Sequence, residues 1–379
     1  MSLTSITSVF TSDKIFLRTL KMIDIETLTS QIKRNCNISD AKYWGVYSMC
    51  GFLLRLRELY RIEKCIRPWE NIRQEEIGEW ISDRENLWKE LEDKDFEDII
   101  VDGNVYGPFE AEKINAELEK EGLVYGAGFG VHMKPSFFLA DLISKETVEG
   151  YNICIAGNEY VRDLSDYPAM LRDRTIFARV DTTRLLLWGR FEELRLRGSK
   201  RPLTFAFSKY GVAPEEEPTE DIYRRISLIA YSEVETYIHH ELGEAFEEKK
   251  IGDEWNSLIA DLFSCRRAEI FARSIKDILS DTSEKGMIKY IIENHKEGSL
   301  GFYVVFLGGY RMLFFPEILE AFQRFAETGN WGLIEDARKA GYRKAAEYAE
   351  RLLSSYKKHK SEKEWISRYI EHEIISELK

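Results

Sequence analysis

Hydrophobic residues recur at three- and four-residue intervals along most of the chain, which is typical of helices packed on one side. Near the N-terminus this spacing predicts three helices joined by short connections. It returns after residue 173 and continues almost to the end of the chain. The predicted helices cover residues 12–34, 40–65, 72–92, 110–121, 174–197, 219–249, 253–280, 284–296, 300–314, 316–327, 330–357 and 361–377.

Shorter apolar runs separated by turn residues occupy the middle of the chain. The dipeptide Asp102-Gly103 lies between two such runs and predicts a β-hairpin over residues 99–106. Further strands are predicted at residues 123–132, 137–143, 151–156 and 203–207. We therefore expect an α+β protein that is predominantly α-helical, with helical domains and a small antiparallel β-sheet insertion.

These patterns divide the chain into three parts. We expect an N-terminal helical unit over residues 1–95, and a small antiparallel β-region with a long helix over residues 96–210. A C-terminal helical domain would take up residues 211–379. The length of the chain, 379 residues, is consistent with more than one packed unit.

The predicted helix between Pro218 and Lys250 is the one segment whose residue types suggest chemistry. It is apolar on most of its surface, which indicates an interior helix. One stripe along it changes from apolar to polar halfway, and runs through Ile222, Ile226, Ile229, Glu233, Tyr237, His240 and Glu244. Buried carboxylates and imidazoles need partners, because an isolated buried charge is costly. We therefore expect an interior cluster of acids and imidazole.

His240 and Glu244 are four residues apart and project from the same face of this helix, with Glu241 beside them. The arrangement is similar to the His-Glu-x-x-His pattern of zinc proteases, except that Glu244 replaces the second histidine. In this interpretation His240, Glu244 and Glu233 bind a divalent metal and Glu241 acts as the general base of a hydrolase. A polar network that only fixes the register of the helices explains the same residues.

Three other residues are candidates for the same site. His239 faces about 100° away from His240 and would support the ligands from beside them, whereas Tyr237 lies on the polar stripe itself. Asp261 lies on the following helix, in a groove of small residues, where either this site or a neighbouring arginine would pair with it. A metal-free pocket formed by Asp261 with Tyr303 and Tyr310 is a further alternative.

Composition narrows the classes of partner. Acidic residues outnumber basic ones by 66 to 54, and the formal charge is −12, which argues against nucleic acid and an anionic membrane surface as partners. No apolar run is long enough for a transmembrane helix, and the first ten residues lack the pattern of a signal peptide. The five cysteines are widely spaced, which is typical of reduced thiols. We expect a soluble, cytoplasmic protein.

The segments IHHELGE at residues 238–244 and AEIFARSIKDILSDT at residues 268–282 resemble an uncharacterised family of bacterial proteins with no assigned activity. Residues 299–303 and 315–317 share the resemblance, which is confined to the C-terminal helical part. It implies no reaction, cofactor or catalytic residue. Two functions stay open: a site that binds a metal or a small ligand, and a non-enzymatic scaffold or interaction protein. The partner is then a small molecule or a protein, and a homo-oligomer is compatible with either.

Overall fold

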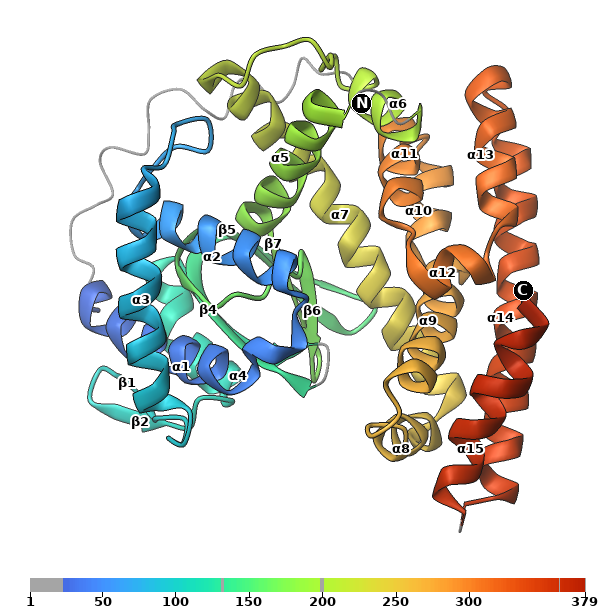
Figure 1. The fold of residues 1–379 in the computed structure, drawn as a ribbon, viewed down its shortest axis with the longest axis horizontal. Helices are drawn as coiled ribbons and strands as arrows, with labels where there is room; N and C mark the ends of the chain where they lie inside the picture. Colours follow the sequence, from blue (N-terminus) through green and yellow to red (C-terminus); the bar gives the residue numbers. More distant parts are fainter. Residues whose placement is uncertain (1–22, 131–132, 198–200, 361, 379) are drawn as a thin grey trace.

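The structure is a computed structural model that describes residues 23–130, 133–197, 201–360 and 362–378. Helices make up most of it, and a curled five-stranded sheet with a separate two-stranded hairpin supplies the strands, so the α+β, mainly helical prediction is confirmed. The sheet and the first helices lie on one side of the molecule, and the later helices lie on the other (Figure 1). Among the described helices, none has both the length and the apolar character needed to cross a membrane.

The N-terminal part begins with helices α1 (Ile25–Tyr43), α2 (Met49–Glu63) and α3 (Gln74–Leu91). Next come the hairpin of β1 (Ile99–Val101) and β2 (Asn104–Tyr106), and the short helix α4 (Ala111–Leu118). The hairpin turns at Asp102 and Gly103, which both have positive φ, as the dipeptide predicted.

The main sheet consists of β3 (Leu123–Phe129), β4 (Pro135–Val148), β5 (Tyr151–Arg162), β6 (Ala169–Arg172) and β7 (Thr175–Arg179), in the order β3-β4-β5-β7-β6. The expectation of an antiparallel sheet was wrong at one pair, because β5 and β7 are parallel. The β6–β7 hairpin folds back so that β7, and not β6, lies beside β5. Alternating residues therefore face two cores: Cys154 and Phe177 face α1 and α4, whereas Ile153 and Ile176 face the helices that follow.

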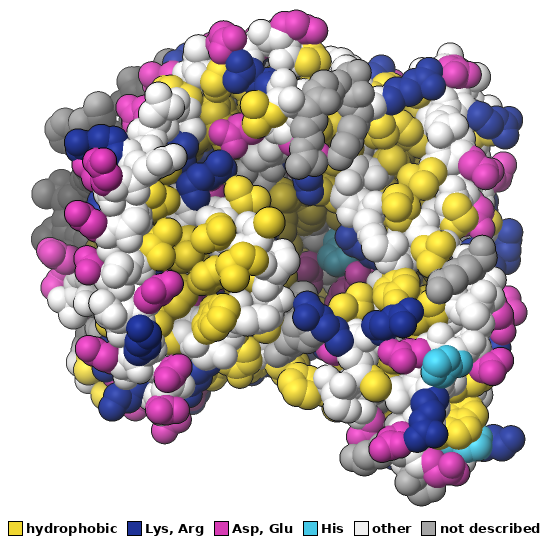
Figure 2. Space-filling view, viewed as in Figure 1, with side chains coloured by type: hydrophobic (Ala, Val, Ile, Leu, Met, Phe, Trp, Pro, Cys, Tyr) yellow, Lys and Arg dark blue, Asp and Glu magenta, His cyan; other side chains and the backbone are white. Residues whose placement is uncertain are grey.

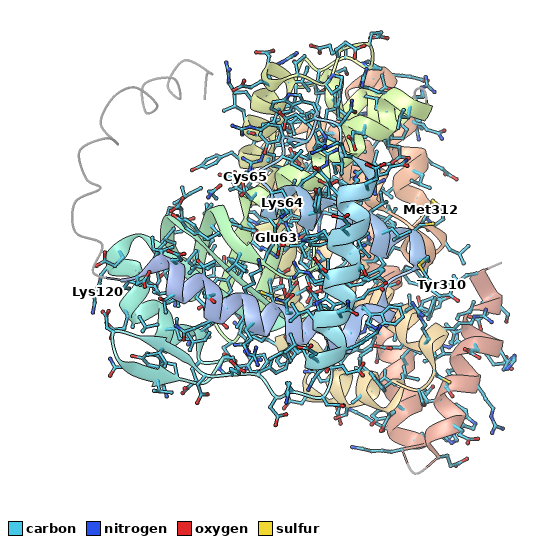
Figure 3. All side chains as sticks on the ribbon, turned by 60° about the vertical axis from the view of Figure 1, so that its left-hand side comes forward. Glu63, Lys64, Cys65, Lys120, Tyr310 and Met312 are labelled. Atoms are coloured by element: carbon cyan, nitrogen blue, oxygen red, sulfur yellow. The ribbon has the colours of Figure 1, made fainter. Side chains whose placement is uncertain are left out.

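The C-terminal part is helical throughout its described residues. Its long members are α5 (Val180–Arg197), α7 (Glu220–Ile251), α9 (Arg266–Thr282) and α14 (Trp331–Lys358). The shorter ones are α6 (Arg201–Ser208), α8 (Asp253–Asp261), α10 (Met287–Glu293), α11 (Glu297–Phe306), α12 (Gly309–Phe314), α13 (Glu317–Thr328) and α15 (Lys363–Tyr369). Helices α5 and α7 run between the sheet and the remaining helices (Figure 1). Tyr310 and Met312 on α12 lie on the opposite side of the molecule from Lys120 (Figure 3).

Several predicted boundaries were wrong for identifiable reasons. Residues 203–207 form part of α6 and not a strand, because a short apolar run fits a buried helix equally well. The helix predicted to break at residues 35–39 continues to Tyr43, and the first residues of that prediction lie outside the described residues. Its buried polar side chains find backbone partners in the β-region: Asn35 bonds both backbone groups of Glu97, and Ser39 donates to Pro135 O.

Candidate active site

Helix α7 carries the residues that the sequence singled out, and it is one uninterrupted helix of 32 residues. Thr219 caps its N-terminus by accepting a hydrogen bond from the Ile222 N–H, and Gly252 follows its last residue. Its apolar side packs against α5 and the sheet, in a core that includes Ile226 and Val234. This packing fixes the side of α7 on which His240 and Glu244 project.

His240 is paired with Asp281 at the end of α9. The distance from His240 Nδ1 to Asp281 Oδ1 is 2.7 Å, and the side chains are 22% and 2% exposed. Burial alone would lower the pKa of His240, but Asp281, with help from Glu244 and Glu241, raises it to about 10. His240 is therefore a cation at neutral pH. Asp281 was not among the residues that the sequence suggested for the site.

A close approach of two backbones brings this pair together. A Cβ atom on Gly243 would lie 2.4 Å from the backbone oxygen of Ser280, a distance that real side chains do not reach. A Cβ on Gly286, just after α9, would lie 2.0 Å from Ser280 O, and the Gly286 Cα lies 3.0 Å from the Cβ position of Gly243. Because both positions are glycine, α7 and the end of α9 approach within contact distance. Asp281 thus comes within hydrogen-bonding distance of the imidazole of His240, which lies about one turn before Gly243 on α7.

Three carboxyl groups around His240 differ in proton affinity. Burial, together with Glu244, raises the pKa of Glu241 to about 7, and burial with Glu244 raises that of Asp277 to about 6. Glu244 moves the other way, because Lys276 and His240 outweigh its burial and lower its pKa. Lys276 Nζ lies 3.2 Å from one oxygen of Glu244, and His240 Nε2 lies 3.7 Å from the other. Such divergent environments are typical of acid–base sites.

The cluster is completed by residues of α11 and α12 and by one strand of the sheet. Arg311 places its guanidinium 3.9 Å from Asp277 and donates to Phe306 O. The buried Tyr303 hydroxyl has no hydrogen-bond partner of good geometry among the described residues. The N–H of Leu171 on β6 donates to Glu241 Oε2 at 3.0 Å. Figure 2 shows a hollow between the two sides of the molecule, with a histidine and acidic side chains on its floor.

Two family models match the chain. They are the N-terminal and C-terminal domains of the family of unknown function DUF6866, and they match residues 27–179 and 184–373. The chain belongs to this family. No curated protein and no solved structure matches it significantly. The prediction of an uncharacterised family is confirmed, and the family covers both parts of the chain, not only the C-terminal part that the sequence suggested.

The site spans both family domains. His240, Glu241, Glu244, Asp277 and Asp281 all come from the C-terminal domain of DUF6866. Leu171, which bonds Glu241, comes from the N-terminal domain. The proton affinity of Glu241 therefore depends on how the two domains of the family are packed together.

Three of the remaining candidates lie in other networks. Glu233 is two turns from His240 along α7, and its carboxylate accepts hydrogen bonds from Ser299 at 2.6 Å and from Tyr210. His239 stacks on Tyr290 of α10, with ring centroids 4.0 Å apart. Asp261 on α8 accepts a hydrogen bond of 2.7 Å from Tyr356. Tyr237 is close enough for Glu233 to add to the rise in its pKa that burial causes.

The predicted metal ligands are not gathered around one point. Within the described residues, no group of three or more His, Cys, Asp or Glu side chains is placed so that it could hold a metal ion. Two of the predicted ligands, His240 and Glu244, face each other, whereas Glu233 is held elsewhere by Ser299. Asp281 already pairs with the other ring nitrogen of His240, and Lys276 pairs with the other carboxylate oxygen of Glu244.

Proposed function

We propose that the cluster on α7 and α9 binds a small polar molecule on the floor of the hollow and exchanges protons with it. The observation that carries this proposal is the set of unequal acids around a charged imidazole. Glu241 has a pKa of about 7, so both its protonation states are populated near neutral pH. A group of this kind is suited to general acid–base catalysis. His240 stays charged and, held in place by Asp281, would stabilise negative charge that develops on the ligand.

Divalent metal binding is the second candidate, favoured by one distance. His240 Nε2 and Glu244 Oε1 are 3.7 Å apart. Two ligands that are each about 2.1 Å from a zinc ion have a similar separation. Glu241 would then activate a water molecule, as in a metal-dependent hydrolase. Elemental analysis of the purified protein decides this point, since stoichiometric zinc, iron or manganese is required.

If the cluster had a purely structural role, Glu241 would be expected to stabilise the fold at neutral pH. Its raised pKa indicates the opposite. The pKa of Glu241 is higher in the folded state than its ordinary 4.5, so the folded protein binds more protons between pH 4.5 and 7. Stability associated with this group is therefore present below pH 4.5 and is lost as the pH rises through 7. Above pH 7 the charged carboxylate destabilises the fold by up to about 3 kcal/mol. A group kept for stability would not carry such a cost.

The substitution Glu241→Gln tests the proposal. Glutamine can still accept the hydrogen bond from Leu171, so we expect a higher free energy of unfolding at pH 8 and a smaller change between pH 5 and 8. The same variant should lose the stabilisation that wild type gains from small polar ligands in a thermal-shift panel. The exposed Asp336→Asn on α14 is the control. A Glu241→Gln protein that is less stable than wild type at pH 8 would support the scaffold alternative.

A further inference from the structure

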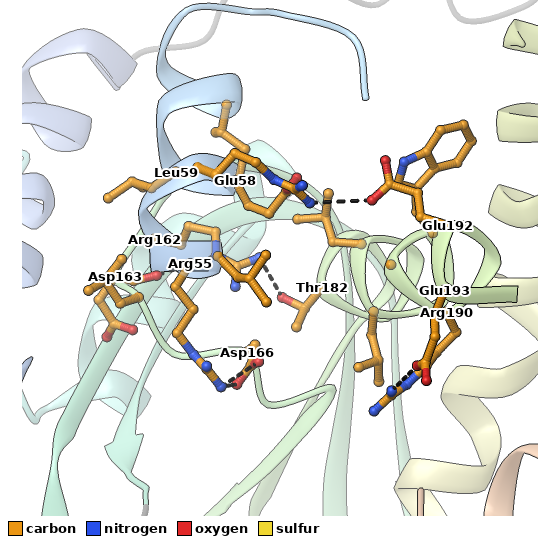
Figure 4. Close-up of a pocket in the computed structure, with 18 of the residues that line it drawn as sticks. Arg55, Glu58, Leu59, Arg162, Asp163, Asp166, Thr182, Arg190, Glu192 and Glu193 are labelled. Carbon is orange, nitrogen blue, oxygen red and sulfur yellow. Dashed lines mark hydrogen bonds and ion pairs between the residues drawn. The ribbon is translucent and has the colours of Figure 1, made fainter. Parts of the chain in front are cut away.

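A cavity away from the His240 cluster lies between α2 of the N-terminal part and α5 of the C-terminal part. Its volume is about 700 Å³. Figure 4 shows residues that line it. Small-molecule sites in proteins typically measure roughly 300 to 1,000 Å³. The cavity is lined by residues of α2 and α5 and by the segment from Arg162 to Asp166, none of which belongs to the His240 cluster.

The walls of this cavity are largely apolar. Leu54 and Leu59 come from α2, whereas Leu185, Leu186 and Leu196 come from α5. Arg162, Asp163 and Thr182 also contribute to the lining, and Arg162 donates to the Thr182 hydroxyl and to Ser165 O. A bound molecule would therefore have an apolar body.

Charges around the cavity are balanced, which argues against an ionic ligand. The lining contains four arginines and five carboxylates. Each arginine already has an acidic partner, in the pairs Arg55–Asp166, Arg57–Glu192, Arg162–Glu159 and Arg190–Glu193. Of the two other lining carboxylates, Glu58 also pairs with Arg57, and Asp163 lies 3.6 Å from the buried Lys134, which is 3.0 Å from Asp40. No described arginine of the lining is left to bind an anion.

Two buried donors of the lining have no hydrogen-bond partner among the described residues. They are Nε of Arg55 and the indole N–H of Trp188, whose side chain is 2% exposed. An unsatisfied buried donor is costly, and natural proteins contain few of them. Both groups donate and neither accepts, so they favour a ligand that carries acceptor oxygens or nitrogens.

Gly189 gives an independent reason to expect an occupant. It lies inside α5, where glycine is less favourable than alanine, and it has an ordinary helical backbone. A Cβ atom at this position would meet nothing within 4 Å, so close packing does not explain the glycine. Gly189 lines the cavity. Its missing side chain keeps room open beside the walls.

We propose that the cavity between α2 and α5 binds a neutral, mainly apolar small molecule that bears a hydrogen-bond acceptor such as a carbonyl group. Balanced charges, leucine walls, two unpartnered donors and the glycine at residue 189 all point to this class. The site is separate from the His240 cluster, so its occupancy does not depend on the function proposed there.

Nile red, a neutral apolar fluorophore with a carbonyl oxygen, is the probe for this site. Wild type should bind one molecule at micromolar concentrations with a saturable rise in fluorescence. Gly189→Phe, which fills the cavity, should weaken binding at least tenfold, whereas Gly189→Ala, which adds a single methyl group, should weaken it much less. If Gly189→Phe fails to fold, Leu186→Trp provides the same test. Leu53→Gln, on the exposed apolar surface of α2 outside the lining, should leave binding unchanged.

Competition identifies the chemical class. 2-Dodecanone should displace Nile red at concentrations at least tenfold lower than dodecanoate or dodecylamine. Equal displacement by dodecanoate would overturn the assignment of a neutral ligand. Non-saturable binding, or equal affinity in the Gly189→Phe and Gly189→Ala proteins, would overturn the site itself.

Discussion

The pairing of His240 with Asp281 sets a measurable pH dependence of stability. The folded pKa of His240 is about 10 and its ordinary value is 6.5. At about 1.4 kcal/mol per pKa unit, this difference corresponds to at most about 5 kcal/mol. The imidazole is 22% exposed, so solvent screening reduces the figure, and the loss of one partner from a buried pair typically costs about 3–5 kcal/mol. We therefore expect Asp281→Asn to lose about 3–4 kcal/mol of stability at pH 7.

The sign of the pH dependence follows from the raised pKa. Because folding raises the proton affinity of His240, its contribution is fully present below pH 6.5 and disappears as the pH rises through about 10. In Asp281→Asn, burial without the anion leaves the imidazole neutral near pH 7, so this contribution is already absent. The two proteins should therefore differ most near pH 6.5, still strongly at pH 7, and much less at pH 10.

Urea unfolding at pH 7 and pH 10 measures the difference, and NMR titration of the histidine Cε1–H signals measures the pKa directly. The His240 signal is assigned by its loss in His240→Gln, and Asp336→Asn on the exposed face of α14 is the matched control. A deficit that is equally large at pH 10 would refute the reasoning. So would a His240 that still titrates near pH 10 without Asp281.

Two further predictions concern packing and buried charge. Gly243→Ala should lower the free energy of unfolding by about 1–3 kcal/mol, since the new methyl group collides with Ser280 O, whereas Gly189→Ala should raise it by about 0.5–1 kcal/mol. Similar values for the two alanine variants in urea unfolding would contradict the close approach. Lys134→Met should cost about 3–5 kcal/mol at pH 7, because it leaves two buried carboxylates without their cation. The cost should shrink as the pH falls toward 6, because Lys134 lowers the pKa of Asp40 and its removal lets Asp40 take up a proton above its wild-type pKa of about 6. A loss under about 1 kcal/mol at pH 7 would contradict this reasoning.

Much of α7 could be predicted from the sequence because its evidence is local. Apolar residues on most sides indicated an interior helix, and Ile226 and Val234 do lie in a core. The four-residue spacing of His240 and Glu244 predicted a shared face, and their side chains do face each other. Helical periodicity needs no knowledge of the neighbours, so such features survive folding unchanged.

The partners of these residues could not be predicted in the same way. Asp281 is 41 positions from His240, and only the close contact at Gly243 shows that they meet. Glu233 lies on the same stripe as His240, yet Tyr210 and Ser299 draw it into another network two turns away. One sequence gives the direction in which a side chain projects but not the element that it meets.

The other wrong predictions came from short segments whose hydrophobic periodicity fits both a strand and a helix. Residues 203–207 contain too few positions to distinguish a strand from a buried helix, and the packing of Phe207 against Phe302 and Phe191 decides for the helix. The cavity beside Gly189 had no sequence signal except a glycine within a helical pattern. Such a glycine has many explanations until the space around it is known.

The hydrogen bond between Leu171 and Glu241 also affects the exposed side of the sheet. Strand β6 is the last strand of the five, so one row of its backbone groups has no strand beside it. Free rows of this kind invite pairing with other chains and lead to aggregation. Helix α7 covers this edge, and Glu241 uses one of its N–H groups. A fragment that ends before α7 would carry an open β-edge, and it should self-associate more readily than the full chain.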